Sequence, residues 1–206
     1  MVHVSNFGKD GGQIFFDKDD YIRFVFSLAY LNTDQSVGKA GNTRHIIKRG
    51  YRGFASAPEE NQLVSIIAFT LLPKEIHLIL RDRKESGISR FMQKVGTGYS
   101  VYMNKKLGRA GGIFQGTYKT SVLEQEDKTR EVIRGIHFLP AVRSMEGASP
   151  EPGTNLEVSE KILAEYPWSS CPDYCGKRSL AFLDHDLIRG VAPDPAGYLS
   201  FVIGRN

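Results

Sequence analysis

Residues 63–81 read LVSIIAFTLLPKEIHLILR and are dominated by apolar residues. It contains two apolar runs rich in β-branched residues, Leu63–Leu72 and Glu75–Arg81, joined by a Pro-Lys pair. Apolar runs of this length on either side of a short turn are typical of two antiparallel strands. The sequence therefore predicts a sheet core with this hairpin at its centre.

Helices and further strands are predicted on both sides of the hairpin. Residues 1–8 form a β-prone run that ends at a glycine, and residues 9–13 form a turn. From Asp17 onward, apolar residues recur at spacings of three and four, which predicts a helix with Asp17 as its N-cap. The elements predicted after the hairpin are a helix, a strand and a helix that ends before Pro140, namely Ser86–Leu107, Ile113–Leu123 and Asp127–Phe138. This order predicts an α+β domain with helices packed on one face of an antiparallel sheet.

The chain is organised as one domain with appendages, since 206 residues give room for one well-cored domain. Residues 32–61 show no sustained periodicity, and we interpret them as a basic surface insertion. Their basic cluster consists of Arg44, His45, Lys48, Arg49 and Arg52. We expect a domain over residues 1–143 that contains this insertion, a linker over residues 144–162, and a C-terminal tail over residues 163–206 that packs on the domain.

Composition excludes few classes of protein. A formal charge of +4 and a pI near 9.0 do not separate nucleic-acid binders from other mildly basic proteins. No apolar run approaches the roughly 18 residues of a membrane span, and residues 1–12 carry no secretory signal. We therefore expect a cytoplasmic protein without a membrane partner. Cys171 and Cys175 lack a second Cys/His pair at zinc-site spacing, so we expect two ordinary reduced thiols.

Glu75 and His77 lie two residues apart in the second predicted strand. Side chains at this spacing point to the same face of a sheet. A carboxylate and an imidazole on one face can share a divalent metal, and the carboxylate is a usable oxygen ligand for Mg²⁺ or Mn²⁺. Without further context, the spacing alone is a weak signal.

Several motifs, in the right order, supply that context: HVSNFG at residues 3–8, IFFDKDDYIRF at 14–24, AFTLLPKEIHLIL at 68–80, YSVYMNKKLGRAGGIFQGTYKT at 99–120, YPWSS at 166–170 and FLDHDLI at 182–188. Together they resemble the motifs of the REP-associated tyrosine transposases, a family of HUH single-strand DNA transposases. The resemblance covers most of the chain apart from residues 32–61 and about 144–162. It implies a ferredoxin-like antiparallel sheet, binding of single-stranded or hairpin DNA, and pairing into homodimers.

The active-site positions depart from the family pattern. In that family, two histidines and a polar residue on a later helix hold a divalent metal, which polarises the phosphate that a tyrosine attacks. By the resemblance, His77 corresponds to the second histidine, Glu75 replaces the first, Gly135 occupies the tyrosine position, and Leu139 replaces the polar residue. The resemblance therefore implies an altered metal site without the family's nucleophile, and a chain that has lost strand cleavage.

The resemblance also implies a DNA-binding surface, although a solvated basic face explains the same charges. The residues that we expect to contact DNA are Arg81, Arg83, Lys84, Arg90, Lys94, Lys105, Lys106, Arg109, Phe114, Tyr118 and Lys119, with the two aromatic residues as stacking partners. The function expected is binding of single-stranded or hairpin DNA without cleavage. Two alternatives stay open. One is an active tyrosine transposase that uses Glu75, His77 and an unidentified tyrosine such as Tyr99 or Tyr102, and the other is a protein-interaction module.

Overall fold

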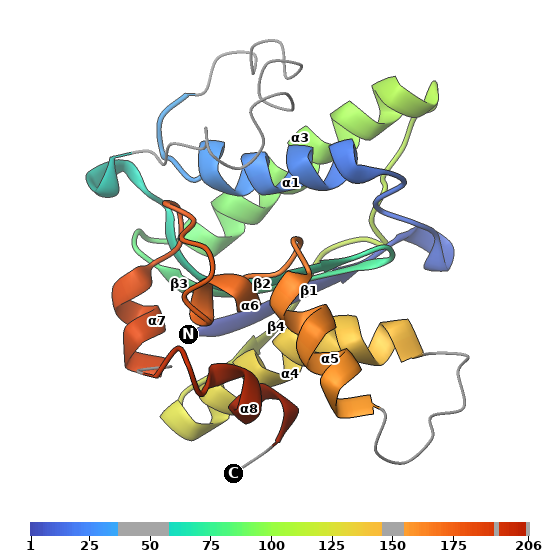
Figure 1. Ribbon diagram of the computed structural model, residues 1–206. Helices are drawn as coiled ribbons and strands as arrows, with labels where there is room; N and C mark the ends of the chain where they lie inside the picture. The colour runs from blue at the N-terminus through green and yellow to red at the C-terminus, as the bar shows by residue number, and fades with distance from the viewer. Residues whose placement is uncertain (37–57, 146–154, 192–193, 205–206) are drawn as a thin grey trace.

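The computed structural model describes residues 1–36, 58–145, 155–191 and 194–204. Four strands form one sheet in the order β2-β3-β1-β4, and all neighbouring strands are antiparallel. Their bounds are β1 Val2–Phe7, β2 Val64–Leu72, β3 Glu75–Asp82 and β4 Lys119–Val122. The predicted hairpin is β2 and β3, while β1 lies between β3 and β4 (Figure 1). The antiparallel sheet and the α+β class are confirmed.

Two helices, α1 (Lys18–Tyr30) and α3 (Gly87–Leu107), cover one face of this sheet (Figure 1). Asp17 caps α1 as predicted, because its carboxylate accepts hydrogen bonds from the backbone N–H groups of Asp19 and Asp20. The side chain of Asp20 in turn accepts from the backbone of Asp17, which completes a capping box. Strand, helix, two strands, helix and strand in this order form the ferredoxin-like arrangement.

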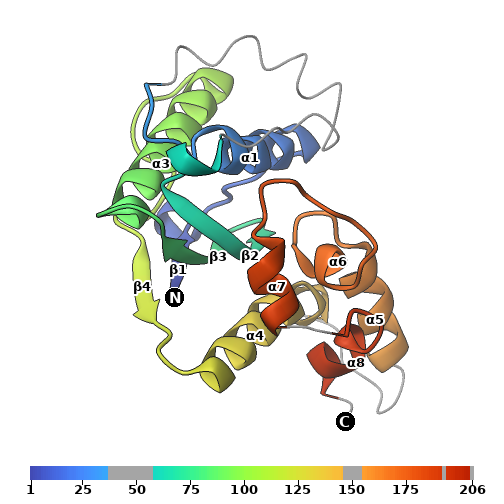
Figure 2. The same cartoon turned by 90° about the vertical axis from the view of Figure 1, so that its left-hand side faces the viewer.

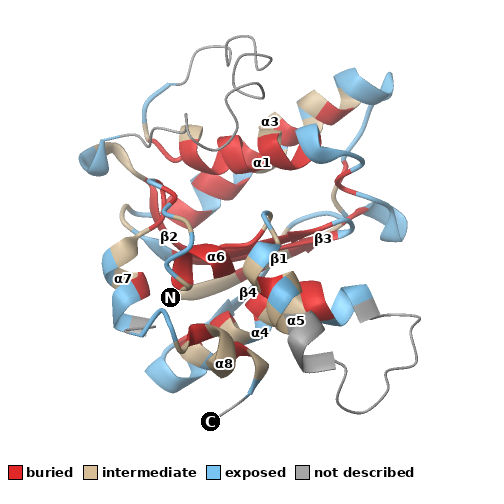
Figure 3. Cartoon of the chain, viewed as in Figure 1, coloured by how far each residue is buried: buried red, intermediate tan, exposed pale blue. Residues whose placement is uncertain are grey.

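The second face of the sheet is covered as well, which the expectation of helices on one face did not include. Helix α4 (Glu126–Met145) packs against β2, and the C-terminal helices lie on the same side (Figures 1 and 2). These are α5 (Asn155–Glu165), α6 (Cys171–Tyr174), α7 (His185–Val191) and α8 (Tyr198–Ile203). Every residue of β2 is buried, so this strand needs an apolar cover on both faces (Figure 3).

The C-terminal region also closes the outer edge of β2. The backbone N–H of Leu71 donates to the carbonyl of Trp168 at 2.8 Å, and that of Ser170 donates to Phe69 at 2.9 Å. Further along the strand, the N–H of Asp184 donates to the carbonyl of Ile66 at 2.9 Å. An uncovered edge strand would expose unpaired backbone groups. The region predicted as a tail is therefore a structural part of the sheet.

Three predicted boundaries differ from the structure. Helix α4 continues through Pro140 to Met145, because the buried side chains of Pro140 and Ala141 pack against the rest of the protein and offset the lost hydrogen bond. Strand β4 spans only four residues, because residues 113–118 form a loop with a positive φ of 118° at Gly116. Helix α5 begins inside the predicted linker and buries Leu163.

Most of the predicted insertion, residues 37–57 with its basic cluster, lies outside the described residues. None of the helices in the described ranges combines the length and the apolarity that a membrane crossing requires.

Candidate functional site

A chain of four side chains lies on the α4 side of the sheet. Glu75 and His77 share this face because they lie two residues apart on β3. Ser5 of β1 pairs with His77 and therefore points to the same face, and His3, two residues from Ser5, points there as well. The Nε2 of His3 lies 3.1 Å from Nδ1 of His77, and the two rings stack. The Nε2 of His77 lies 3.3 Å from Oε2 of Glu75. Arg143 of α4 completes this arrangement, which we call the His77 chain.

Arg143 binds the other oxygen of the carboxylate, with its Nε 2.7 Å from Oε1 of Glu75. Hydrogen bonds from His77 and Arg143 lower the pKa of Glu75 to about 2, although burial opposes this shift. Burial, and then the nearby His77, lower the pKa of His3 to about 4. At neutral pH the His77 chain therefore contains an ionised Glu75 carboxylate, which is paired with the guanidinium of Arg143, and a neutral His3.

The residues present do not fit the divalent metal that the resemblance implied. Glu75 and His77 come together as predicted, but His3 and Glu75 approach opposite nitrogens of the His77 ring. One ion cannot bind all three in this arrangement, and no group of three metal-binding side chains exists elsewhere in the described ranges. Arg143 already holds one oxygen of the carboxylate. Two protein ligands with a guanidinium beside them make a poor site for a cation.

The position that the resemblance assigned to the nucleophile carries no side chain. Gly135 is exposed on α4, and a Cβ added there would meet no heavy atom within 4 Å. Leu139 is half-buried one turn further along the same row, which continues to Arg143. Gly135 provides no side chain in this row, Leu139 an aliphatic group and Arg143 a cation. None of these groups can attack a phosphate.

The tyrosines that we considered as replacements have structural roles. The hydroxyl of Tyr99 donates to the carbonyl of Ile14 at 2.9 Å, and that of Tyr102 donates to Asp20 at 2.8 Å. Burial raises the pKa of both tyrosines above the ordinary value. Both lie on α3, which covers the face of the sheet opposite the His77 chain. Neither is placed to act with Glu75 and His77.

His137 is fully buried inside the α4 layer. Its Nδ1 lies 2.6 Å from the hydroxyl of Tyr198, and its Nε2 lies 2.7 Å from the hydroxyl of Ser170. Burial, and then the charge of Arg178, lower its pKa to about 3. His137 is therefore a neutral side chain that ties α4 to two segments of the C-terminal region.

The predicted DNA-contacting cations divide into two groups. One group is engaged with other parts of the protein: Arg81, Arg83, Lys84, Lys94 and Lys106. Arg83, for example, pairs with Glu59 at 2.6 Å, and Lys106 pairs with the fully buried Asp20 at 2.5 Å. The second group is exposed and forms no ion pair within the described part of the chain: Arg90, Lys105, Arg109 and Lys119.

The two predicted aromatic contacts, Phe114 and Tyr118, lie in the loop before β4. Phe114 is half-buried, and Tyr118 is half-buried beside β4. Lys119 lies over the ring of Phe7, 5.6 Å from its centre.

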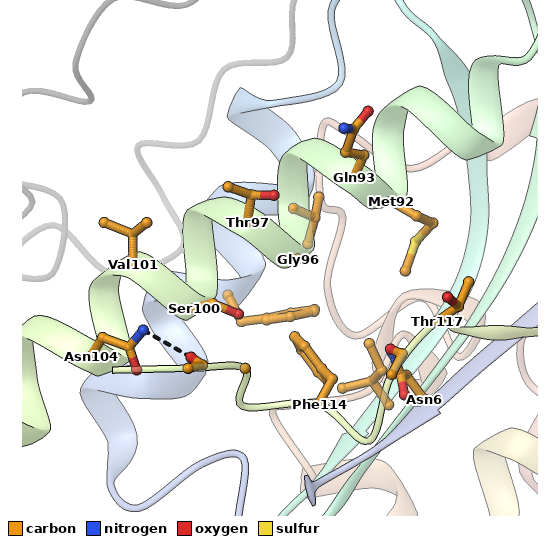
Figure 4. A pocket seen from close by; sticks show the side chains of 16 residues that line it. Asn6, Met92, Gln93, Gly96, Thr97, Ser100, Val101, Asn104, Phe114 and Thr117 are labelled. Carbon is orange, nitrogen blue, oxygen red and sulfur yellow. Dashed lines mark hydrogen bonds between the residues drawn. The ribbon is translucent and has the colours of Figure 1, made fainter. Parts of the chain in front are cut away.

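A groove of about 630 Å³ runs between α3 and the loop before β4, and we call it the α3 groove (Figure 4). Its polar lining is uncharged and consists of Asn6, Gln93, Thr97, Ser100, Asn104 and Thr117. Phe114 and Met92 contribute apolar surface, and Gly96 leaves the wall of the helix without a side chain. The groove therefore offers hydrogen-bonding groups and an aromatic ring, and none of the described residues that line it is ionisable.

One acceptor in the α3 groove is without a partner. Asn104 donates through Nδ2 to the carbonyl of Gly111 at 2.8 Å, as Figure 4 shows. Its Oδ1 is buried and has no hydrogen-bond partner among the described residues. Buried polar atoms normally have partners, so this oxygen is an unsatisfied acceptor in the helix wall of the groove.

Two of the exposed cations extend the α3 wall of the groove. Arg90 precedes Gln93 by three residues, and Lys105 follows Val101 by four, so each continues a row of residues that line the groove. Arg109 follows Gly108, the C-cap of α3, and its N–H donates to the carbonyl of Asn104. Positive charge therefore lies at both ends of the groove wall.

Sequence reasoning missed the residues that decide both regions. The predicted end of the helix before Pro140 excludes Arg143, although its spacing of eight from Gly135 is a usable signal. Asn104 lies inside the quoted motif at residues 99–120, but nothing in the sequence distinguishes it from other polar helix residues.

No family model matches the chain, and no curated protein matches it in sequence. A solved structure described as "Structure of the REP associates tyrosine transposase bound to a REP hairpin" is similar in backbone, with a TM-score of 0.49 and 13% sequence identity. The match covers 87% of this chain and 82% of that chain. At this identity and TM-score, we transfer no residue role, ligand or activity from it.

Proposed function

We propose that this protein binds single-stranded or hairpin nucleic acid, with DNA as the expected form, through the α3 groove and without cleaving the strand. The observation that carries the proposal is the groove itself, which combines an aromatic ring at Phe114, an acceptor at Asn104 that has no partner among the described residues, and two cations of the same helix, Arg90 and Lys105, that form no ion pair with those residues.

The chemistry of the groove suits unpaired bases. Amide and hydroxyl groups form hydrogen bonds with exposed base edges, and an aromatic side chain stacks on a base face. Cations at the rim, such as Arg90 and Lys105, suit the phosphates that connect those bases. In a regular duplex the bases are stacked and paired, so they are not available to a groove of this kind.

Absence of cleavage is proposed on the chemistry of α4. Gly135 supplies no nucleophile, and the tyrosines at 99 and 102 are held by hydrogen bonds on the other side of the sheet. The two ligands Glu75 and His77 do not make a fitting metal site in the presence of Arg143.

Binding assays with hairpin, linear single-stranded and duplex DNA test this proposal. We expect hairpin and single-stranded DNA to bind more tightly than duplex. The variant Arg90→Ala/Lys105→Ala/Arg109→Ala should bind more weakly. The slope of log K against log salt concentration should also be smaller in magnitude by about 2 to 3, since each phosphate contact contributes slightly less than one unit to that slope.

A matched control removes three exposed cations from the other side of the sheet: Lys128→Ala/Lys161→Ala/Lys177→Ala. Its net charge equals that of the groove variant, so general attraction to DNA falls equally in both. An equal loss of affinity in the two variants would contradict the groove as the interface. Failure of the wild type to bind any DNA at low salt would favour the protein-interaction module.

A further inference from the structure

We propose that Arg143 replaces the divalent cation at the Glu75–His77 pair, so that the wild-type site is metal-free and is held in this state by its own guanidinium. The inference concerns the His77 chain on the α4 side of the sheet and does not depend on DNA binding in the α3 groove.

The first argument is the place that Arg143 occupies. Glu75 is only 6% exposed, and its two oxygens bind Nε2 of His77 at 3.3 Å and Nε of Arg143 at 2.7 Å. A metal ion shared by Glu75 and His77 would need the carboxylate oxygen and the ring nitrogen that now face each other. It would also lie beside a fixed positive charge, which repels a divalent cation.

The second argument is charge. A buried carboxylate is stable only when a cation or several hydrogen-bond donors compensate it. The guanidinium supplies the cation and a directed hydrogen bond together, and it does so without open coordination positions. The site is therefore compensated as it stands and gains little from an added ion.

The third argument is the path of α4. The helix continues through Pro140, which costs one backbone hydrogen bond, and the continuation brings Arg143 to Glu75. The row Gly135, Leu139 and Arg143 thus ends in a cation on the carboxylate. The position of Arg143 on the carboxylate, the charge that it compensates and the path of α4 that brings it there together leave the site without a need for a metal and without the means to hold one.

Mn²⁺ binding, measured by electron paramagnetic resonance and calorimetry on the full chain, tests the inference. We expect no His77-dependent binding by the wild type, so wild type and His77→Ala should give the same traces. We expect Arg143→Met, which removes the charge and keeps most of the length, to bind Mn²⁺ at least tenfold more tightly than the wild type. Binding should disappear again in Arg143→Met/His77→Ala.

Lys128→Met removes the same charge from an exposed position on the same helix and should leave Mn²⁺ binding unchanged. If Arg143→Met does not fold, as judged by circular dichroism, Arg143→Gln takes its place. His77-dependent Mn²⁺ binding by the wild type would overturn the inference. So would a folded Arg143 variant that binds no more tightly than the wild type, because Arg143 would then not be what keeps the ion out.

Discussion

The two faces of the sheet contrast in what they leave available to a ligand. On the α3 side, the groove is lined by uncharged polar groups, and among the described residues the Oδ1 of Asn104 has no partner and Arg90, Lys105 and Arg109 form no ion pair. On the α4 side, the polar groups satisfy each other: Arg143 pairs with Glu75, and His137 binds two hydroxyls. Unsatisfied groups and unpaired charges mark surfaces that bind, whereas satisfied ones mark surfaces that hold the fold together.

This contrast is informative because the motif resemblance directs attention to the α4 side. Its active-site positions lie there, at His77, Gly135 and Leu139. The side chains that occupy those positions leave a compensated charge network without a nucleophile. The unpartnered acceptor and the groove with an uncharged polar lining lie on the opposite face, in residues whose types are individually unremarkable.

The largest expected effect is the complete loss of covalent strand cleavage, which depends on the residues of the α4 side. We predict that wild type and Gly135→Tyr both fail to form a covalent adduct with end-labelled hairpin DNA in the presence of Mn²⁺, as seen on denaturing gels. A nucleophile alone is not enough, because a misplaced or missing partner typically costs orders of magnitude in rate.

The variant Glu75→His/Gly135→Tyr/Leu139→Asn is the strongest attempt at recovery, and with Arg143 retained we expect only trace product. A protease-sensitive shifted band from the wild type would refute the proposed loss of cleavage. It would direct the search for a nucleophile to Tyr118, which is half-buried beside β4.

Acid should destabilise the α4 side specifically. The pKa of His137 is about 3 in the folded protein and about 6.5 in the unfolded chain, so above pH 6.5 the residue is neutral in both states. Below pH 6.5, the unfolded chain binds a proton that the folded protein does not, and stability falls until the pH reaches about 3. The upper limit of the loss is about 4 to 5 kcal/mol.

Urea denaturation between pH 7 and pH 4 measures this loss. His3, with a folded pKa of about 4, contributes in the same direction, and Glu75 adds to the loss only below about pH 4.5. His137→Gln should start from lower stability at pH 7 and show a flatter pH dependence. An unchanged slope in this variant would show that His137 is not the group responsible.

Gly96 and Gly135 provide a direct comparison of the two faces as binding surfaces. Both are helical glycines, and a Cβ added at either would meet no heavy atom within 4 Å. We predict that Gly96→Leu lowers affinity for single-stranded DNA at least tenfold by filling the α3 groove, whereas Gly135→Leu leaves affinity unchanged. The reverse result would place the DNA on the α4 face.

The sheet and its first two helices could be predicted because local patterns determine them. The hairpin at 63–81, the N-cap at Asp17 and the helix at 86–107 each follow from a few neighbouring residues. The end of α4 could not be predicted, because Pro140 is tolerated only through packing with distant segments. For the same reason, the sequence gives no sign that residues 166–170 complete the edge of β2.

The candidate site was only partly predictable. Alternation along a strand correctly brings Glu75 and His77 together, since it is a local property. Whether a basic residue is free depends on partners far away in sequence, such as Asp20 for Lys106 and Glu59 for Arg83. A basic cluster read along the chain therefore mixes structural ion pairs with cations that remain available.

The smallest expected effect refines the comparison of the two glycines. Glycine in a helix interior costs roughly 0.5 to 1 kcal/mol relative to alanine, because the unfolded chain loses more conformational freedom on folding. Since neither position is crowded, Gly96→Ala and Gly135→Ala should each raise the free energy of unfolding by about that amount, as measured by urea denaturation. The α3 groove should tolerate a single methyl group, so DNA affinity should fall less than threefold in Gly96→Ala. Destabilisation by Gly96→Ala would mean that the helix wall is more crowded than the structure indicates, and the tenfold effect expected for Gly96→Leu could then no longer be assigned to a filled groove.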